Sequence, residues 1–327
     1  GDADAQFNLS LMYGRGDGVA QDYGQAVEWC GRAAEQGHGM AQTNLGVMYE
    51  RGDGVVQDYG QAVKWYRRAA EQGVAEAQNK LGVMYDVGWW VLPRDYGQAV
   101  KWHHRAAEQG FAEAQLNLGV LYHAGRGVQQ DYGQAVQWFH RAAEQGHTDA
   151  QFNLGVMFAK GLGVKQDDRQ AVEWYRRAAE EGDATAQNSL GWMYDKGRGV
   201  LQDYRQAVEW YRRAAEEGDA EAQLNMGNMH ANGKGVKQDD RQAVEWYRRA
   251  AEQGLAEAQH NLGVMYSMGE GVVEDYVTAH MWVSVGRANG HNSGELLEFL
   301  EKLMTKDQIV RSQQRASDCL ANQYKNC

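Results

Sequence analysis

The sequence has almost no proline and little cysteine. Its 327 residues include one proline, Pro93, and three cysteines, against 40 glycines. Loop-rich and disordered chains usually carry glycine and proline together, so glycine without proline predicts helices joined by many short turns. With 11 tryptophans and 43% hydrophobic residues the chain can form a core, which excludes a disordered protein.

A long apolar run and an excess of basic charge are also missing. No apolar stretch approaches the ~20 residues with which a helix spans a bilayer. The formal net charge is −11. Because binding to phosphates needs a basic face, this balance argues against a nucleic-acid-binding protein.

The chain consists of one unit repeated eight times. The unit recurs every 36 residues, except for one step of 37 between Ala77 and Ala114. The opening alanines are Ala5, Ala41, Ala77, Ala114, Ala150, Ala186, Ala222 and Ala258. Each unit closes on a glycine, from Gly37 to Gly290. Gly1 holds the closing position of a preceding unit, so we expect further sequence, including any signal peptide, upstream.

Each unit predicts a hairpin of two helices. In the second unit, residues 41, 45, 48 and 49 are apolar, which is the spacing of an amphipathic helix. Gly46, a position where seven of the eight units have glycine, predicts a close approach of two helices. A glycine-rich turn follows, Asp58 caps the second helix, and Gly73 ends it. One unit cannot bury both apolar faces, so stacked units are expected to form an α-solenoid.

The recurring motifs identify a family. Ala-Gln-x-x-Leu-Gly-x-x-Tyr, Gly-x-Gly-Val, Asp-Tyr-x-x-Ala-x-x-Trp and Ala-Ala-x-x-Gly together resemble the Sel1-like repeat, a relative of the tetratricopeptide repeat. The resemblance covers residues 1–290 and implies an all-α fold, a right-handed superhelical α-solenoid of eight helix-turn-helix repeats. Residues 291–327 are expected to form a C-terminal helical cap and tail, with a capping box at Thr305 and Gln308. Members of this family are scaffolds that bind other proteins, and very few have an accepted catalytic role.

Eight tryptophans share one position of the repeat. They are Trp29, Trp65, Trp102, Trp138, Trp174, Trp210, Trp246 and Trp282. Each lies on the same side of its helix as small alanines one turn away. We therefore interpret them as core between helices rather than as an aromatic ladder for a ligand.

The turn of the third unit breaks the pattern. It is one residue longer than the others and carries Trp89, Trp90 and Leu92 beside Pro93. Because turn residues lie at the surface, these large apolar side chains indicate one of two arrangements. They contact a partner protein, or the lengthened turn folds back over a neighbouring unit.

One face of the first helix varies between units. Positions 43, 47 and 50 of the second unit share this face; Phe152 stands at the first of these positions, and Trp192 replaces a recurring valine at the second. An asparagine row that includes Asn117 and Asn153 runs beside them. The resemblance to tetratricopeptide folds places this face in a concave groove. The amides would hold an extended peptide there, or else bond the backbone of the neighbouring unit, which the regular recurrence favours.

The sequence contains little that indicates an enzyme. The ten histidines are scattered, without a His-Glu-x-x-His set or zinc spacing with cysteines. The glycine turns lack the Lys-Ser/Thr of a phosphate loop, and no Ser-x-x-Lys occurs. We therefore expect no enzyme, no cofactor and no metal. A hydrolase of the β-lactamase-like kind is a less favoured alternative, since the chain lacks the two cysteines per repeat of those relatives.

The cysteines indicate a compartment. Cys319 and Cys327 lie eight residues apart at the end of the chain, where a disulfide would pin the tail; Cys30 is expected to be buried. Because disulfides persist in oxidising compartments, we expect a periplasmic or secreted bacterial protein, with a cytoplasmic one as the alternative. The sequence thus predicts a non-catalytic scaffold that binds a host or envelope protein through its concave face and its aromatic turn. The alternative is an adaptor that organises an enzyme or envelope assembly.

Overall fold

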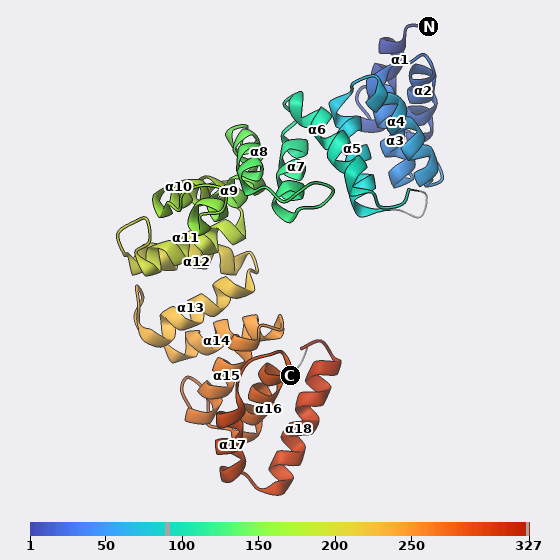
Figure 1. The fold of residues 1–327 in the computed structure, drawn as a ribbon. Helices are drawn as coiled ribbons and strands as arrows, with labels where there is room; N and C mark the ends of the chain where they lie inside the picture. Colours follow the sequence, from blue (N-terminus) through green and yellow to red (C-terminus); the bar gives the residue numbers. More distant parts are fainter. Residues whose placement is uncertain (89–91, 325–326) are drawn as a thin grey trace. The chain divides into compact units, whose positions relative to one another are not determined.

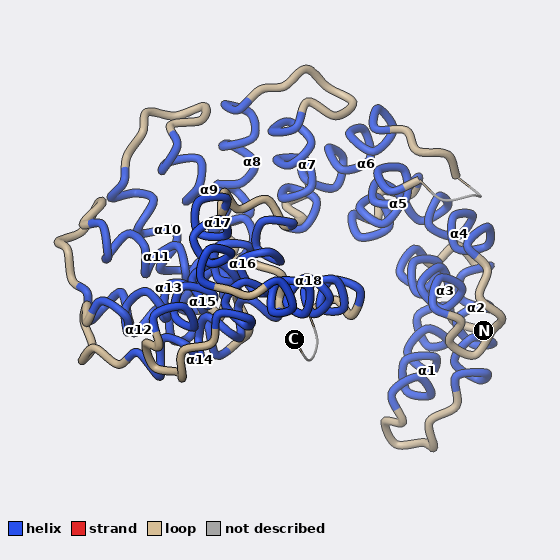
Figure 2. Tube along the Cα trace, turned by 90° about the horizontal axis from the view of Figure 1, so that it is seen from below, coloured by secondary structure: helices blue, strands red, loops and turns tan. Residues whose placement is uncertain are grey.

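The computed structural model describes residues 1–88, 92–324 and 327. Its regular elements are α-helices joined by loops (Figures 1 and 2). The helices are α1 (Ala3–Arg15), α2 (Tyr23–Glu35), α3 (Gly39–Arg51), α4 (Tyr59–Glu71), α5 (Ala75–Val87), α6 (Tyr96–Glu108), α7 (Ala112–Ala124), α8 (Tyr132–Glu144), α9 (Thr148–Lys160), α10 (Asp168–Glu180), α11 (Ala184–Lys196), α12 (Tyr204–Glu216), α13 (Ala220–Asn232), α14 (Asp240–Glu252), α15 (Ala256–Met268), α16 (Tyr276–Ala288), α17 (Gly294–Leu303) and α18 (Lys306–Ala321).

These helices form two compact units. Residues Gly1–Gln166 hold α1 to α9, and residues Asp167–Cys327 hold α10 to α18. Within each unit every helix packs against the next along the chain up to α16, and α17 and α18 both pack against α16. The predicted boundary at residue 290 falls inside the second unit. The predicted α-solenoid of eight helix pairs with C-terminal helices is confirmed.

Local capping explains where the helices begin and end. The N-cap aspartate of α4, Asp58, accepts a hydrogen bond of 3.0 Å from the backbone N–H of Gln61. The other second helices have the same cap at Asp22, Asp95, Asp131, Asp167, Asp203, Asp239 and Asp275. The first helix α3 ends at Gly52 in the left-handed region, with φ 83°. The next turn glycine, Gly54, lies against the backbone carbonyl of Tyr23, so the turn also lets neighbouring repeats stack.

A second glycine sets the distance between the two helices of a repeat. A Cβ added to Gly46 of α3 would lie 2.6 Å from the ring of Tyr66 in α4, and that ring is fully buried. The same contact recurs at Gly82–His103, Gly119–Phe139, Gly191–Tyr211, Gly227–Tyr247 and Gly263–Val283. The close approach that the recurring glycine predicts is therefore confirmed.

The repeated tryptophans belong to the core. Six of them are buried, and Trp29 and Trp102 are half-buried. In the first seven repeats an arginine three residues later stacks on the indole, with its Cζ 4.4–4.7 Å from the ring centroid. The prediction of an interhelix core rather than a ligand ladder is confirmed.

A ladder of glutamines joins neighbouring repeats, and the sequence does not predict it; in each pair a buried glutamine accepts from an exposed one. Gln42 donates to the carbonyl of Ala34 in the preceding repeat at 3.0 Å and accepts from Gln72 at 2.7 Å. The same pairs are Gln109–Gln78, Gln145–Gln115 and Gln253–Gln223. In the sixth repeat Glu217 occupies the donor position, and within the described part of the chain the buried Oε1 of Gln187 finds no hydrogen-bond partner. An acid at this position thus leaves a polar atom of the interface unpaired.

A disulfide ties the end of the chain to α18. Cys319 and Cys327 are bonded, with their Cα atoms 5.1 Å apart. Arg315 of α18 donates to the carbonyl of Cys327 at 3.1 Å, and the Tyr324 hydroxyl donates to Oδ1 of Asn289 at 3.0 Å. Hydrogen bonds therefore hold Cys327 to α18 and Tyr324 to the eighth repeat.

Replacing Gly46 by alanine tests the close helix contact. We expect Gly46→Ala to lower the free energy of unfolding by about 1–3 kcal/mol, because its methyl group would overlap a ring with no room to move. Gly31→Ala is the matched control, since nothing lies within 4 Å of the Cβ that it adds to α2. That variant should gain about 0.5–1 kcal/mol from helix propensity. Urea unfolding, followed by circular dichroism, measures the free energy of unfolding of both variants. A change of the same sign in both would contradict the close contact at Gly46.

Buried His103 should make the fold sensitive to acid. Burial lowers the pKa of His103 from 6.5 to about 4. The unfolded chain therefore binds more protons across that window, so the free energy of unfolding should fall as pH drops from 6.5 towards 4. His103→Tyr, which installs the residue of the second repeat, should show a weaker loss. Urea unfolding of both proteins over this pH range measures the difference, and identical pH profiles would contradict the prediction.

Candidate functional site

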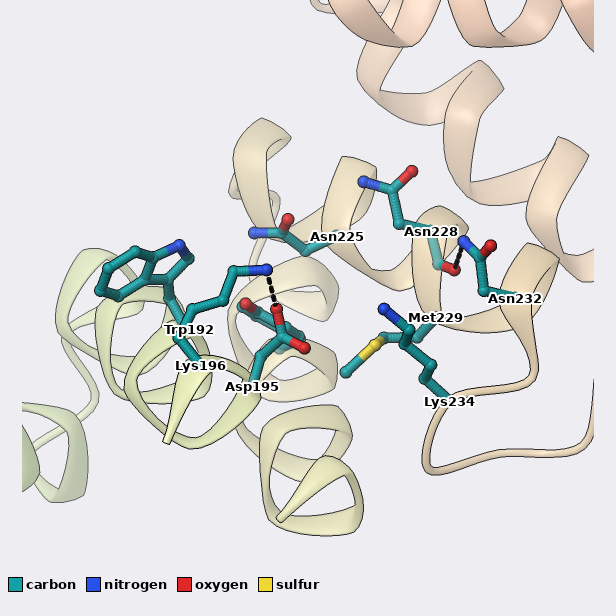
Figure 3. Close-up of a pocket in the computed structure, with 9 residues that line it drawn as sticks. Trp192, Asp195, Lys196, Asn225, Asn228, Met229, Asn232 and Lys234 are labelled. Carbon is teal, nitrogen blue, oxygen red and sulfur yellow. Dashed lines mark hydrogen bonds and ion pairs between the residues drawn. The ribbon is translucent and has the colours of Figure 1, made fainter. Parts of the chain in front are cut away.

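The candidate site is a pocket between two first helices of the second unit, α11 and α13 (Figure 3). Its volume is about 270 Å³. The lining residues are Trp192, Asp195, Lys196, Tyr211, Asn225, Asn228, Met229, Asn232 and Lys234. Apart from the adjacent pairs Asp195–Lys196 and Asn228–Met229, the lining residues of α11 and those of α13 are three, four or seven positions apart, so each helix presents one face to the pocket.

The floor of the pocket is apolar and its rim is polar. Tyr211 and Met229 are buried beneath it. Burial and the nearby Asp195 carboxylate raise the pKa of Tyr211, so its hydroxyl stays neutral. The rim therefore carries the charged groups and the amides that a ligand meets first.

Trp192 is the most exposed aromatic ring of this pocket, with 37% of its surface accessible. The guanidinium carbon of Arg198 lies 5.2 Å from its ring centroid. Two hydrogen bonds of 2.9 and 2.6 Å to Asp168 fix that guanidinium. A tryptophan held by a fixed cation is a rigid apolar surface beside the pocket.

Hydrogen bonds orient the amides on the α13 side. The Tyr247 hydroxyl donates to Oδ1 of Asn228 at 2.8 Å, which leaves the Asn228 amino group as its remaining polar group. The Asn232 amino group donates to the backbone carbonyl of Asn228 at 2.8 Å. On the α11 side the Lys196 ammonium lies 2.6 Å from the Asp195 carboxylate (Figure 3).

The first unit has a pocket at equivalent positions of its first helices, with the opposite charge. Its volume is about 360 Å³, and it lies among residues of α3, α5 and α7 and the loop before α7. The lining residues are Glu50, Glu76, Asn79, Lys80, Val83, Met84, Phe111 and Glu113. Three carboxylates face one ammonium there.

The predicted contact residues have different outcomes. The pocket includes Trp192, whereas Phe152 is half-buried on α9 of the first unit. Leu92 is only 7% exposed and packs in the core with Tyr66 and Met84, so its selection as a contact residue was wrong. Leu92 stands three residues before the N-cap Asp95, as Val55 does before Asp58, and its side chain packs against the neighbouring second repeat. Trp89 and Trp90 lie outside the described residues.

The asparagine row bonds the preceding repeat, but not its backbone. Asn117 donates to Oδ1 of Asn79 at 3.1 Å, and Asn225 donates to Oδ1 of Asn188 at 3.0 Å. The favoured interpretation is therefore wrong about the acceptor at both positions. Asn153 is half-buried on α9.

Sequence reasoning missed most of the pocket. Lys196, Asn228, Asn232 and Lys234 line it, and none was selected. One signal was present, because Asn228 replaces the valine that most repeats carry at the position of Trp192. The sixth and seventh repeats both lack the recurring valine at this position, and two such departures in neighbouring repeats indicate a binding site.

A histidine of α16, a glutamate of α17 and a serine of α18 meet near the end of the chain. His280 Nδ1 lies 2.8 Å from the Ser312 hydroxyl, and its Nε2 lies 3.4 Å from Glu301. Ser312 is fully buried and donates to the carbonyl of Ile309 at 2.8 Å. This hydroxyl is thus engaged in packing and closed to a substrate. Within residues 1–88, 92–324 and 327, no group of three His, Cys, Asp or Glu side chains is placed to hold a metal ion.

Comparisons with known proteins identify the family. The sequence matches the Sel1 repeat over residues 3–38, 39–74, 75–111, 112–147, 148–183, 184–219, 220–255 and 256–290. Among the described helices, none is long and apolar enough to cross a membrane. No curated protein matches the chain.

Two solved structures resemble it over most of its length. A Sel1 repeat protein from Oxalobacter formigenes is 36% identical over 91% of this chain and 86% of its own, with a TM-score of 0.70. A protective antigen of uropathogenic Escherichia coli strains, with an SLR fold, is 32% identical over 99% of this chain and 94% of its own, with a TM-score of 0.61. Sel1-repeat proteins are generally scaffolds for protein interactions. The chain belongs to the Sel1 repeat family.

Proposed function

We propose that this protein is a non-catalytic scaffold that binds a partner protein through the first-helix faces of its repeats. The observation that carries the proposal is a row of exposed apolar residues at one position of these helices. Val83 and Val120 in the first unit and Trp192 in the second are 36%, 39% and 37% exposed. Apolar side chains that recur in solvent, beside pockets, are typical of a protein-binding surface.

The aromatic turn of the third repeat remains part of the proposal. Trp89 and Trp90 are large apolar residues in a turn, where the other repeats carry small and polar ones. We propose that they add a contact to the partner at this repeat.

We further propose that the protein works in the periplasm or is secreted. The Cys319–Cys327 disulfide supports this, since such bonds persist in oxidising compartments. The similarity to a protective antigen of uropathogenic Escherichia coli points the same way, because an antigen that protects must be accessible to the immune system.

Site-specific photo-crosslinking tests the binding face. A photoreactive residue at Val120 or Trp192 should capture the same partner protein, identified by mass spectrometry. Gln137 and Glu209, exposed on the second helices α8 and α12, are the matched control positions. Equal capture from the control positions, or capture from them alone, would contradict the proposal.

Thiol counting tests the compartment. Protein isolated from its native compartment and alkylated under denaturing conditions should take up one alkyl group, at Cys30. After reduction it should take up three, because Cys319 and Cys327 become free. Intact mass spectrometry distinguishes the two states. Three alkylated thiols without prior reduction would argue for a reducing compartment.

A further inference from the structure

We propose that the pocket between α11 and α13 binds side-chain carboxylates of an acidic, extended segment of the partner. The inference rests on the proposed function and names the chemistry of the segment that this face recognises. An apolar side chain next to the carboxylate would rest on Trp192.

The free polar groups at the rim are mostly donors. The Tyr247 hydroxyl occupies Oδ1 of Asn228, so Asn228 offers its two N–H groups to a ligand. Lys196 uses its ammonium on Asp195 but retains further N–H donors. Lys234, in the exposed loop after α13, adds a second ammonium; its Nζ lies 5.6 Å from the ring centroid of Tyr204, a contact that leaves its N–H donors available. A site rich in N–H donors fits an anionic acceptor.

The accessible charge at the rim is positive, although the chain as a whole carries −11. The only carboxylate that lines the pocket, Asp195, has a side chain that is 12% exposed and already paired with Lys196. Lys196 itself is half exposed. An acidic segment therefore meets two ammonium groups and the asparagine amides before it meets a carboxylate.

The equivalent pocket of the first unit selects against the same segment. Glu50, Glu76 and Glu113 line it together with the single ammonium of Lys80. Like charges across an interface oppose binding, so an acidic segment should bind in the second unit alone.

Trp192 supplies the apolar half of the recognition. Its exposed indole lies beside Lys196, on the side away from Lys234 (Figure 3). A segment that spans the pocket from Lys234 to Trp192 thus places an acidic residue near an apolar one. Rigid tryptophans of this kind are enriched among residues that dominate binding energy.

Fluorescence anisotropy with the full chain tests the inference. The probe is a fluorescein-labelled, amidated peptide of alternating Glu and Leu. Lys234→Ala should weaken its binding about tenfold, as expected for one charge-assisted hydrogen bond. Trp192→Val and Asn228→Val should weaken it as well, and each installs the residue that most other repeats carry. Circular dichroism checks that every variant remains folded.

Lys237→Ala is the matched control. Lys237 is exposed three residues beyond Lys234, and it does not line the pocket. Its loss removes the same charge and should leave the affinity unchanged. An equal loss in both lysine variants would overturn the proposed site in favour of diffuse electrostatic attraction.

Two further peptides separate the possible ligands. If an amidated peptide of Gln and Leu binds as tightly as the Glu–Leu peptide, the pocket does not recognise carboxylates and the inference is wrong. Equal binding of the same peptide with a free C-terminus would assign the site to a terminal carboxylate instead of side chains. If the Glu–Leu peptide fails to bind while crosslinkers at Val120 and Trp192 still capture the partner, this inference is wrong and the proposed function stands.

Discussion

The contact between a first-helix glycine and a buried side chain of the second helix is the constraint on which most of the repeats depend. At Gly46 the two helices approach so closely that no Cβ fits between the backbone and Tyr66. This contact fixes which side of the first helix faces inward. The next position, occupied by Val83, Val120 and Trp192 in three of the repeats, is then turned towards solvent. The packing of a repeat thus determines which residues remain free to bind a partner.

A constant frame with variable exposed residues explains how two pockets of opposite charge arise. The frame consists of the glycine contact, the capped second helices and the glutamine ladder, which recur along the chain. Substitutions at exposed positions then give an acidic pocket around Glu76 and Glu113 and a donor-rich one around Asn228 and Lys234. Because each repeat contacts mainly its neighbours, such changes alter recognition with little effect on the fold.

The sequence predicts the helices well because their signals are local. The cap at Asp58, the helix end at Gly52 and the burial of Trp65 each follow from residues a few positions away. It does not predict contacts whose partners lie a full repeat apart. Asn117 bonds a side chain of the preceding repeat, and which atom comes within reach depends on the spacing between first helices. The burial of Leu92 also depends on a neighbouring repeat, because the core cluster that holds it includes Tyr66 of the second repeat.

Hydrogen–deuterium exchange of the full chain, with and without the Glu–Leu peptide, tests the central claim that ligands bind on the first-helix face. We expect slower exchange in α11, α13 and the loop that follows α13, while the second helices α12 and α14 and the first unit exchange as before. Protection confined to α12 and α14, or spread evenly over both units, would contradict it.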